Sequence, residues 1–332
     1  MRALRLRGES FALAVVVLTE GSTYRKPGAL VVVSDDGTRY GAISGGCLEQ
    51  SLETSALQVL GTNTPSCAVF DTQSDDDAVF GSGSGCRGSM TVLLIPIDSN
   101  RPNALVDALQ TADASHLVLR LALIMDGPHR GAGRCWYGFD EIGLAFDAPD
   151  LTAFRDRPAG EYRLSSSAGD ARLAVLDVPP SPRVLLIGAG PEVPPLIRLA
   201  QEMGWHTMVM DHRETMLKKH ARLAEKSMLA RPAAGLAQLA EHVFDACIVM
   251  THTAANDLEA MIALAGRGEQ YIGLLGPPAR RDEILRQLDA ASRESFAGRL
   301  HAPVGVPLGG NGPEAVALSI AAGLQQSFSR GR

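Results

Sequence analysis

Two short glycine-rich loops in the first third of the chain each carry a cysteine. The first covers residues 44–49 (SGGCLE) and the second residues 81–88 (GSGSGCRG), so the thiols belong to Cys47 and Cys86. Glycine lacks a Cβ, and backbone N–H groups in such loops can therefore approach a phosphate or a pterin closely. The two loops together predict a site for a sulfur-reactive, anionic ligand. The neighbouring glycines are Gly45, Gly46, Gly85 and Gly88.

The first loop is expected to lie at a strand-to-helix turn. An apolar stretch over residues 40–43 precedes it, and leucines follow at positions 48, 52, 57 and 60, which is roughly helical spacing. A helix N-terminus attracts negative charge and lowers the pKa of a nearby thiol. For either loop taken alone, the alternative is a buried cysteine packed beside a tight turn.

A third loop, residues 21–28 (GSTYRKPG), joins two expected strands and carries adjacent cations. Its Arg25 is a candidate anion contact, because a guanidinium group matches the geometry of an oxyanion. An ordinary solvated hairpin loop is the alternative, and spacing alone favours it.

Length and composition indicate a globular protein of two domains. The chain has 332 residues, and domains commonly contain ~100–200. Hydrophobic residues make up 45% and charged residues 20%, which is typical of a globular chain and not of a disordered one. The net charge is −6, with a pI of about 5.8 and no dense run of lysine and arginine, so nucleic acid is not expected as a partner.

The cysteines and the apolar segments indicate the compartment. The chain has 5 cysteines, widely spaced and without a C-x-x-C pair, which is typical of a reduced, cytoplasmic protein. Cys67, Cys135 and Cys247 lie in strand-like apolar runs and are expected to be structural. No segment approaches the ~20 apolar residues that span a membrane, so no membrane association is expected.

The carboxyl-terminal half shows the pattern of a βαβ unit. An apolar strand at 183–187 is followed by Gly188-Ala189-Gly190, a helix over 194–203, a strand at 206–210 and then Asp211. This acid follows the first glycine by 23 positions, close to the ~20 at which a carboxylate meets a ribose hydroxyl in dinucleotide-binding folds. Val193 stands where the third glycine of that fingerprint would be.

A polar pair follows a later strand. His252 comes directly after the apolar stretch 246–250, at the carboxyl end of a parallel strand, where open α/β sheets bind ligands. With Asp257 it could form a polar site, and a helix-capping role is the alternative. Nucleotide-binding candidates are therefore Gly188, Gly190, Asp211 and His252.

The expected fold is α/β. An N-terminal mixed α/β domain over residues 1–180 precedes a C-terminal Rossmann-like, doubly wound parallel sheet over residues 183–330. The prolines at 179, 180 and 182 mark the boundary between them. No catalytic constellation and no protein metal site are evident, since nucleophile-elbow, Walker and H-E-x-x-H patterns are lacking.

The ordered set of motifs resembles the xanthine dehydrogenase accessory family, also called the XdhC/CoxI family. In the N-terminal half the resemblance is carried by the loop 21–29, the turn ISGGCLE at 43–49, and the segments 76–81 and 85–88. In the C-terminal half it is carried by GAG at 188–190, DHR at 211–213, Thr251-His252 with Asp257, YIG at 271–273 with Gly276, and PVG at 303–305 with PE at 313–314.

This resemblance implies a maturation factor that binds the molybdenum cofactor, molybdopterin, as cargo. The factor protects the cofactor while a cysteine desulfurase supplies its terminal sulfur, and delivers it to a xanthine dehydrogenase-type molybdenum hydroxylase. Cys47 and Cys86 would be the thiols that contact the cofactor, and the molybdenum would be held only through it. A factor of this kind has no turnover of its own, and a homodimer is expected.

Two other functions remain open. An NAD(P)-dependent oxidoreductase would use the βαβ unit and Asp211, and bound NAD(P) or another nucleotide is possible. A non-catalytic interaction scaffold would use the Rossmann-like domain only for dimerisation. Bound pterin would support the maturation factor, and nicotinamide-dependent turnover would support the oxidoreductase.

Overall fold

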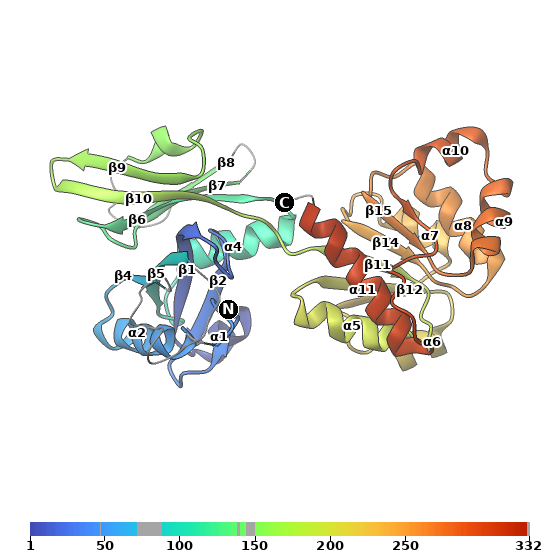
Figure 1. The fold of residues 1–332 in the computed structure, drawn as a ribbon, viewed down its shortest axis with the longest axis horizontal. Helices are drawn as coiled ribbons and strands as arrows, with labels where there is room; N and C mark the ends of the chain where they lie inside the picture. The colour runs from blue at the N-terminus through green and yellow to red at the C-terminus, as the bar shows by residue number, and fades with distance from the viewer. Residues whose placement is uncertain (47, 72–87, 138–139, 144–149, 331–332) are drawn as a thin grey trace. The chain divides into compact units, whose positions relative to one another are not determined.

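The computed structural model describes residues 1–46, 48–71, 88–137, 140–143 and 150–330. The chain forms two compact units, Met1–Pro180 and Ser181–Arg332, called here the N-terminal and C-terminal units (Figure 1). Within the described residues, no helix is both long and apolar enough to cross a membrane.

The N-terminal unit begins with an antiparallel sheet, called sheet A, in the order β3-β2-β1-β5-β4. Its central strand β1 is rich in β-branched and apolar residues, and seven consecutive positions from Phe11 are buried. Such a run is expected for a strand covered on both faces. The strands are β1 Phe11–Gly21, β2 Leu30–Ser34, β3 Arg39–Tyr40, β4 Ser66–Asp71 and β5 Gly88–Ile97.

A second antiparallel sheet of the same unit, sheet B, has the order β8-β7-β6-β10-β9. Its strands are β6 Leu119–Asp126, β7 Gly133–Tyr137, β8 Asp140–Gly143, β9 Gly160–Ser166 and β10 Gly169–Val178. The helical segments of the unit are α1 Arg2–Arg7, α2 Glu49–Thr62, α4 Ala104–Ser115 and a short 3-10 helix at Thr152–Phe154.

The two faces of sheet A pack against different partners. Alternate residues of β1, beginning with Phe11 and Leu13, join residues of α4 and sheet B in one core. The residues between them, beginning with Ala12 and Ala14, pack against Leu52 and other residues of α2. This period of two is the geometry of a strand, and it separates the side of sheet A that carries α2 from the side that faces sheet B.

The C-terminal unit contains a six-stranded parallel sheet in the order β13-β12-β11-β14-β15-β16. Residues of α5, α6 and α11 form the core on one face, and residues of α7, α8 and α9 that on the other (Figure 1). The strands are β11 Arg183–Ile187, β12 His206–Asp211, β13 Lys226–Leu229, β14 Ala246–Val249, β15 Tyr271–Leu274 and β16 Leu300–His301. The helices are α5 Val193–Glu202, α6 Glu214–His220, α7 Pro232–Gln238, α8 Ala254–Ala265, α9 Pro278–Gln287, α10 Ala290–Ser295 and α11 Pro313–Arg330.

This arrangement confirms the predicted fold class, a mixed α/β unit followed by a Rossmann-like parallel sheet. The chain proceeds from β11 to β12 and β13 on one side, then returns to place β14 on the other side of β11. The strand order therefore reverses between β11 and β14, and open α/β sheets bind ligands at the carboxyl ends of the strands at such a point.

Candidate functional site

The first glycine loop is held by a buried network around Glu49. Its Oε1 accepts hydrogen bonds from the backbone N–H groups of Ile43 (3.2 Å) and Ser44 (2.9 Å), and the Ser44 hydroxyl donates to Oε2. The same Ser44 oxygen accepts the N–H groups of Gly46 and Leu48, each at 3.1 Å. Glu49, the first residue of α2, thus fixes the turn that precedes its own helix.

The carboxylate of Glu49 is stabilised in its charged form. The side chain is buried, which alone would raise its pKa, but hydrogen bonds from Ser44 and the charge of Arg39 lower the pKa below its usual value. A buried, charged carboxylate with several donors keeps a turn in one conformation.

The glycines of this turn face open space. Gly45 and Gly46 are exposed, and no atom lies within 4 Å of a Cβ built on either residue. Gly46 has a φ of +128°, which side-chain-bearing residues rarely adopt. Packing within the described residues therefore does not require glycine here, and the turn leaves room for a ligand to approach its backbone. Cys47 itself lies outside the described residues.

The loop between β1 and β2 brings Arg25 to this turn. The Arg25 Nε donates to the carbonyl oxygen of Ala42 at 2.8 Å, just before the network around Ser44. The side chain is exposed, and its Nη atoms make no hydrogen bond to a described residue. At the base of the loop, Gly28 has a φ of +90°, and a Cβ there would lie 2.4 Å from the backbone oxygen of Asp177. The loop is therefore anchored at both ends.

Gly88 ends the second glycine loop at the same end of sheet A. It is buried and pairs with Gly21, the last residue of β1. A Cβ on Gly88 would lie 2.5 Å from the backbone oxygen of Ser22 and 2.7 Å from that of Glu20, so glycine is required for close packing. The structure thus places Arg25, Gly45, Gly46 and Gly88 at one end of the sheet. Gly85 and Cys86 fall in the segment 72–87, which the structure does not describe.

In the C-terminal unit, Gly188 and Gly190 occupy the point where the strand order reverses. Gly188 has a φ of +117°, and a Cβ there would lie 2.3 Å from the backbone oxygen of Met250. A Cβ on Gly190 would lie 2.5 Å from both Glu192 Oε2 and His252 Nε2. The glycines therefore allow the loops after β11 and β14 to meet.

His252 is paired with Glu192, a residue that the sequence motifs do not single out. Its Nε2 lies 3.1 Å from Glu192 Oε2, and its backbone has a φ of +61°, unusual for a residue with a side chain. His220 adds a second imidazole nearby, with Nδ1 2.9 Å from the carbonyl oxygen of Ala189. The side chain of His252 is 43% exposed, whereas Glu192 is buried, so only the imidazole of this pair is open to solvent.

Asp257 has partners other than His252. Its Oδ1 accepts hydrogen bonds from the Thr251 hydroxyl (2.5 Å) and the Thr251 N–H (3.2 Å). Its Oδ2 lies 2.5 Å from Nη2 of Arg280, and the Asp257 side chain is completely buried. The carboxylate therefore joins the end of β14 to the first turn of α9, and the structure records no hydrogen bond or ion pair between Asp257 and His252.

Asp211 is buried, and its two carboxylate oxygens already accept hydrogen bonds from donors of the protein. Oδ1 accepts from the backbone N–H (2.8 Å) and the Nε (2.9 Å) of Arg213. Oδ2 accepts from the N–H of Ala189 and from Nη2 of Arg213, each at 2.7 Å. A carboxylate offers about four acceptor positions, so a ribose hydroxyl would have to displace one of these donors.

Asp211→Asn is expected to lower the free energy of unfolding by about 2 kcal/mol at neutral pH, because it weakens charged hydrogen bonds and leaves donors unpaired. Burial alone would raise the pKa of Asp211, but hydrogen bonds from Arg213 and Ala189 lower it. The stabilisation is therefore complete above the unfolded pKa of about 3.9 and is lost as pH falls through the folded value.

Urea unfolding across this pH range measures the effect. The matched control is Asp282→Asn, since Asp282 is exposed and pairs with its partly exposed neighbour Arg281. Equal stabilities of the two variants at pH 7 would contradict the structural role of Asp211.

Comparison with known proteins agrees with this architecture. Residues 4–71 match the XdhC and CoxI family, and residues 184–324 match the XdhC Rossmann domain. A Bacillus subtilis protein, described as a probable xanthine dehydrogenase subunit, is 29% identical over 97% of this chain and 94% of its own length. The Escherichia coli protein YqeB, described as uncharacterized, is 30% identical over 44% of this chain and 27% of its own length. A crystal structure titled as a xanthine dehydrogenase from Bacillus halodurans has a TM-score of 0.77 and 28% identity, covering 100% of this chain and 95% of that one.

Proposed function

Because the chain belongs to the XdhC and CoxI family, we propose that it is a chaperone for the molybdenum cofactor. It binds the cofactor as cargo, protects it during sulfuration and delivers it to a xanthine dehydrogenase-type molybdenum hydroxylase. The names of the Bacillus relatives, which refer to xanthine dehydrogenase, support an accessory role toward such an enzyme.

The observation that carries this proposal is that the loop between β1 and β2, the turn at Gly45 and Gly46, and the start of β5 at Gly88 lie at one end of sheet A. The open turn at Gly45 and Gly46 offers backbone without side chains, and Arg25 is hydrogen-bonded beside it with its Nη atoms available. These groups fit the phosphate and the pterin of the cargo. Cys47 and Cys86 would meet its sulfur and molybdenum end, since thiolates are suitable ligands for soft metal centres.

Each protein group has a defined part in this proposal. Arg25 binds the anionic end of the cargo, and the Ser44–Glu49 network holds the turn ready before the cargo arrives. The cargo supplies the molybdenum chemistry only after transfer to its client. The proposed partners are the client hydroxylase and a cysteine desulfurase, and we propose that the protein acts as a homodimer in the cytoplasm.

Nucleotide binding remains a second proposal for the C-terminal unit. It is supported by the close approach of Gly188 and Gly190 to the end of β14 and by the exposed side chain of His252, which pairs with Glu192. The four donors on Asp211 favour a nucleotide bound without ribose recognition by that carboxylate. An oxidoreductase would also need an acid or base beside the nicotinamide, and His252 is the candidate. A scaffold would bind neither pterin nor nucleotide.

Co-expression tests the proposal. A molybdenum hydroxylase expressed with this chain should contain more sulfurated cofactor and show higher activity than the same enzyme expressed alone. Arg25→Gln should lower the cofactor retained by this chain by about tenfold or more, because a charged hydrogen bond to phosphate contributes about 1.5–3 kcal/mol. Equal client activity with and without the chain would refute the maturation role.

Lys26→Gln is the matched control, since Lys26 is the adjacent, exposed cation and its side chain makes no hydrogen bond or ion pair with a described residue. It should retain the cofactor at the level of the unmodified protein. Equal losses in the two variants would show that overall charge, and not the position of Arg25, governs retention.

A further inference from the structure

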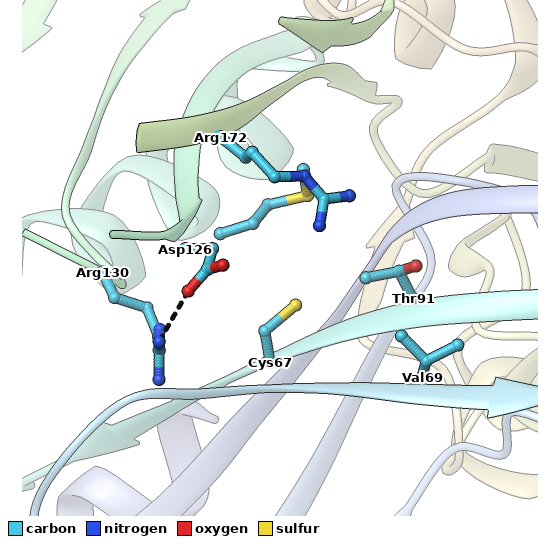
Figure 2. Close-up of a pocket in the computed structure, with 7 residues that line it drawn as sticks. Cys67, Val69, Thr91, Asp126, Arg130 and Arg172 are labelled. Atoms are coloured by element: carbon cyan, nitrogen blue, oxygen red, sulfur yellow. Dashed lines mark hydrogen bonds and ion pairs between the residues drawn. The ribbon is translucent and has the colours of Figure 1, made fainter. Parts of the chain in front are cut away.

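A small polar cavity lies between the two sheets of the N-terminal unit (Figure 2). Its volume is about 160 Å³, enough for several water molecules. Sheet A contributes β4 and β5, and sheet B contributes β6, β10 and the connection that follows β6. The lining residues are Cys67, Val69, Thr91, Met125, Asp126, Arg130 and Arg172.

This cavity is separate from the turn at Gly45 and Gly46. That turn leads into α2, which covers one face of sheet A. Cys67 packs against the core on the opposite face, between sheet A and sheet B. A ligand in the cavity would therefore not occupy the proposed cargo site, and its binding does not depend on the proposed function.

Two guanidinium groups face this space with unused donors. Arg172 donates through Nε to Glu161 Oε1 at 2.6 Å, and its Nη atoms make no hydrogen bond to a described residue. Arg130 donates through Nη2 to Asp126 Oδ1 at 2.7 Å, and its other nitrogens are likewise not hydrogen-bonded within the described chain. Figure 2 shows the Nη end of Arg172 and the sulfur of Cys67 directed toward the same space.

The thiol adds no negative charge to the cavity. Cys67 is half-buried, and burial raises its pKa above the ordinary value, although Arg130 and Arg172 partly oppose this effect. The thiol is therefore protonated at neutral pH and is a weak hydrogen-bond donor. Glu161 balances the charge of Arg172 and Asp126 that of Arg130, but the remaining N–H donors of both guanidinium groups can still bind the oxygens of an anion.

Asp126 gives the cavity a means of selecting among anions. Its Oδ1 accepts hydrogen bonds from Arg130 and from the N–H of Gly127 at 2.9 Å, whereas its Oδ2 accepts none from a described residue. A carboxylate oxygen repels an anion without a proton but accepts a hydrogen bond from one that carries a proton. Inorganic hydrogen phosphate has such a proton at neutral pH, since its last proton dissociates only in strongly basic solution, and sulfate does not. A phosphomonoester, whose second pKa is about 6, has largely lost the corresponding proton.

We propose that this cavity is a phosphate-binding site in which Arg172 and Arg130 bind the phosphate oxygens, Asp126 Oδ2 accepts the phosphate proton and the Cys67 thiol contacts the anion. The bound group is inorganic phosphate, because a phosphomonoester has largely lost the proton that Asp126 would accept. The apolar side chains of Val69 and Met125 limit the size of the ligand.

Equilibrium dialysis of the full chain with radiolabelled phosphate and sulfate tests the proposal. We expect saturable binding of phosphate at millimolar concentration or below, with sulfate bound at least about tenfold more weakly, which corresponds to one lost charged hydrogen bond. Competition by glycerol phosphate tests the role of the proton. Weak competition is expected, because this ester has largely lost the corresponding proton at neutral pH, and competition as strong as that by unlabelled phosphate would contradict the role of Asp126. Absence of saturable phosphate binding would overturn the proposal.

Variants locate the binding. Arg172→Gln should lose phosphate affinity by about tenfold or more. Asp126→Asn should abolish the preference for phosphate over sulfate, and because Asp126 is exposed it is not expected to affect folding. The controls are Arg101→Gln and Asp98→Asn, which alter an exposed ion pair of the same unit. The assignment would be overturned if the control variants lost as much phosphate affinity as the cavity variants. It would also be overturned if Asp126→Asn kept the preference for phosphate over sulfate.

Two further measurements separate this site from the cargo site. Arg25→Gln should leave phosphate binding at the cavity unchanged, and phosphate should slow the alkylation of Cys67 by iodoacetamide, followed by mass spectrometry of its peptide. If Arg25→Gln abolishes all phosphate binding, the anion occupies the cargo site and the cavity proposal is wrong.

Discussion

Glu49→Gln is expected to abolish cofactor retention and to lower the free energy of unfolding of the N-terminal unit by about 3 kcal/mol. The Ser44 hydroxyl donates to the carboxylate while its oxygen accepts two backbone N–H groups. An amide nitrogen in place of Oε2 would leave the hydroxyl proton without its acceptor. The turn at Gly45 and Gly46 would then lose the conformation that receives the cargo. Urea unfolding and the pterin content of anaerobically purified protein measure the two effects.

The control for this prediction lies one helical turn further along α2. Glu53→Gln removes the same charge from a partly exposed side chain that makes no hydrogen bond or ion pair with a described residue. It should change stability by less than about 0.5 kcal/mol and leave retention intact. If Glu49→Gln retains full cofactor and stability, the network around Ser44 does not shape the site.

Gly188→Ala is expected to destabilise the C-terminal unit by at least about 3 kcal/mol. The new Cβ would lie 2.3 Å from the backbone oxygen of Met250 and 2.8 Å from the backbone nitrogen of Thr251. Because these are backbone atoms, the ends of β11 and β14 would have to separate. The point at which the strand order reverses would open, and any nucleotide binding there would be lost. Thermal and urea unfolding measure the cost.

Two further glycines serve as controls that separate the cost of the steric contact at Gly188 from the cost of its positive φ. Gly204 has a φ of +71° with no atom within 4 Å of a Cβ, so Gly204→Ala should cost only about 1–2 kcal/mol. Gly266 has a φ of −85° and equally open surroundings, and Gly266→Ala should be neutral or slightly stabilising. A cost for Gly188→Ala no larger than that for Gly204→Ala would contradict the close approach of the two strands.

Strands and helices with a clear period were predictable from the sequence. The apolar run from Phe11 forms β1, and Leu52, Leu57 and Leu60 after the first glycine loop lie on α2. The apolar stretch over residues 40–43 was expected to lead into the turn as a strand, but β3 ends at Tyr40. The carbonyl oxygen of Ala42 instead accepts a hydrogen bond from the Arg25 side chain. The period of apolar residues does not show that a backbone carbonyl will be hydrogen-bonded by a side chain and not by a neighbouring strand.

The position of a functional residue was easier to predict than its orientation. Spacing located Asp211 at the end of β12, but four donors already occupy its carboxylate, two of them from the side chain of Arg213. The partner of His252 was missed because Glu192 belongs to the loop after a different strand. Such pairings depend on the order of strands in the sheet and leave no local pattern.

The surroundings of Cys67 show the same limit. Its strand is apolar, and the thiol was therefore expected to be structural. Arg130 and Arg172 line the same cavity as Cys67, but they belong to the connection after β6 and to β10, which come much later in the sequence. Cys135 and Cys247, by contrast, are buried, and burial raises the pKa of Cys135 to about 12. The apolar pattern correctly described the backbone of all three strands but did not identify the polar neighbours of one thiol.

The central place of β1 in sheet A has a consequence during synthesis of the protein. β1 ends at Gly21, but its neighbour β5 begins only at Gly88. A ribosome adds about 5–20 residues per second, so one edge of this apolar strand stays unpaired on the nascent chain for several seconds. An unpaired edge is prone to join other chains. The emerging chain must be kept from aggregating until β5 is made, and a truncated product that stops at residue 71 would lack the strand needed to close sheet A.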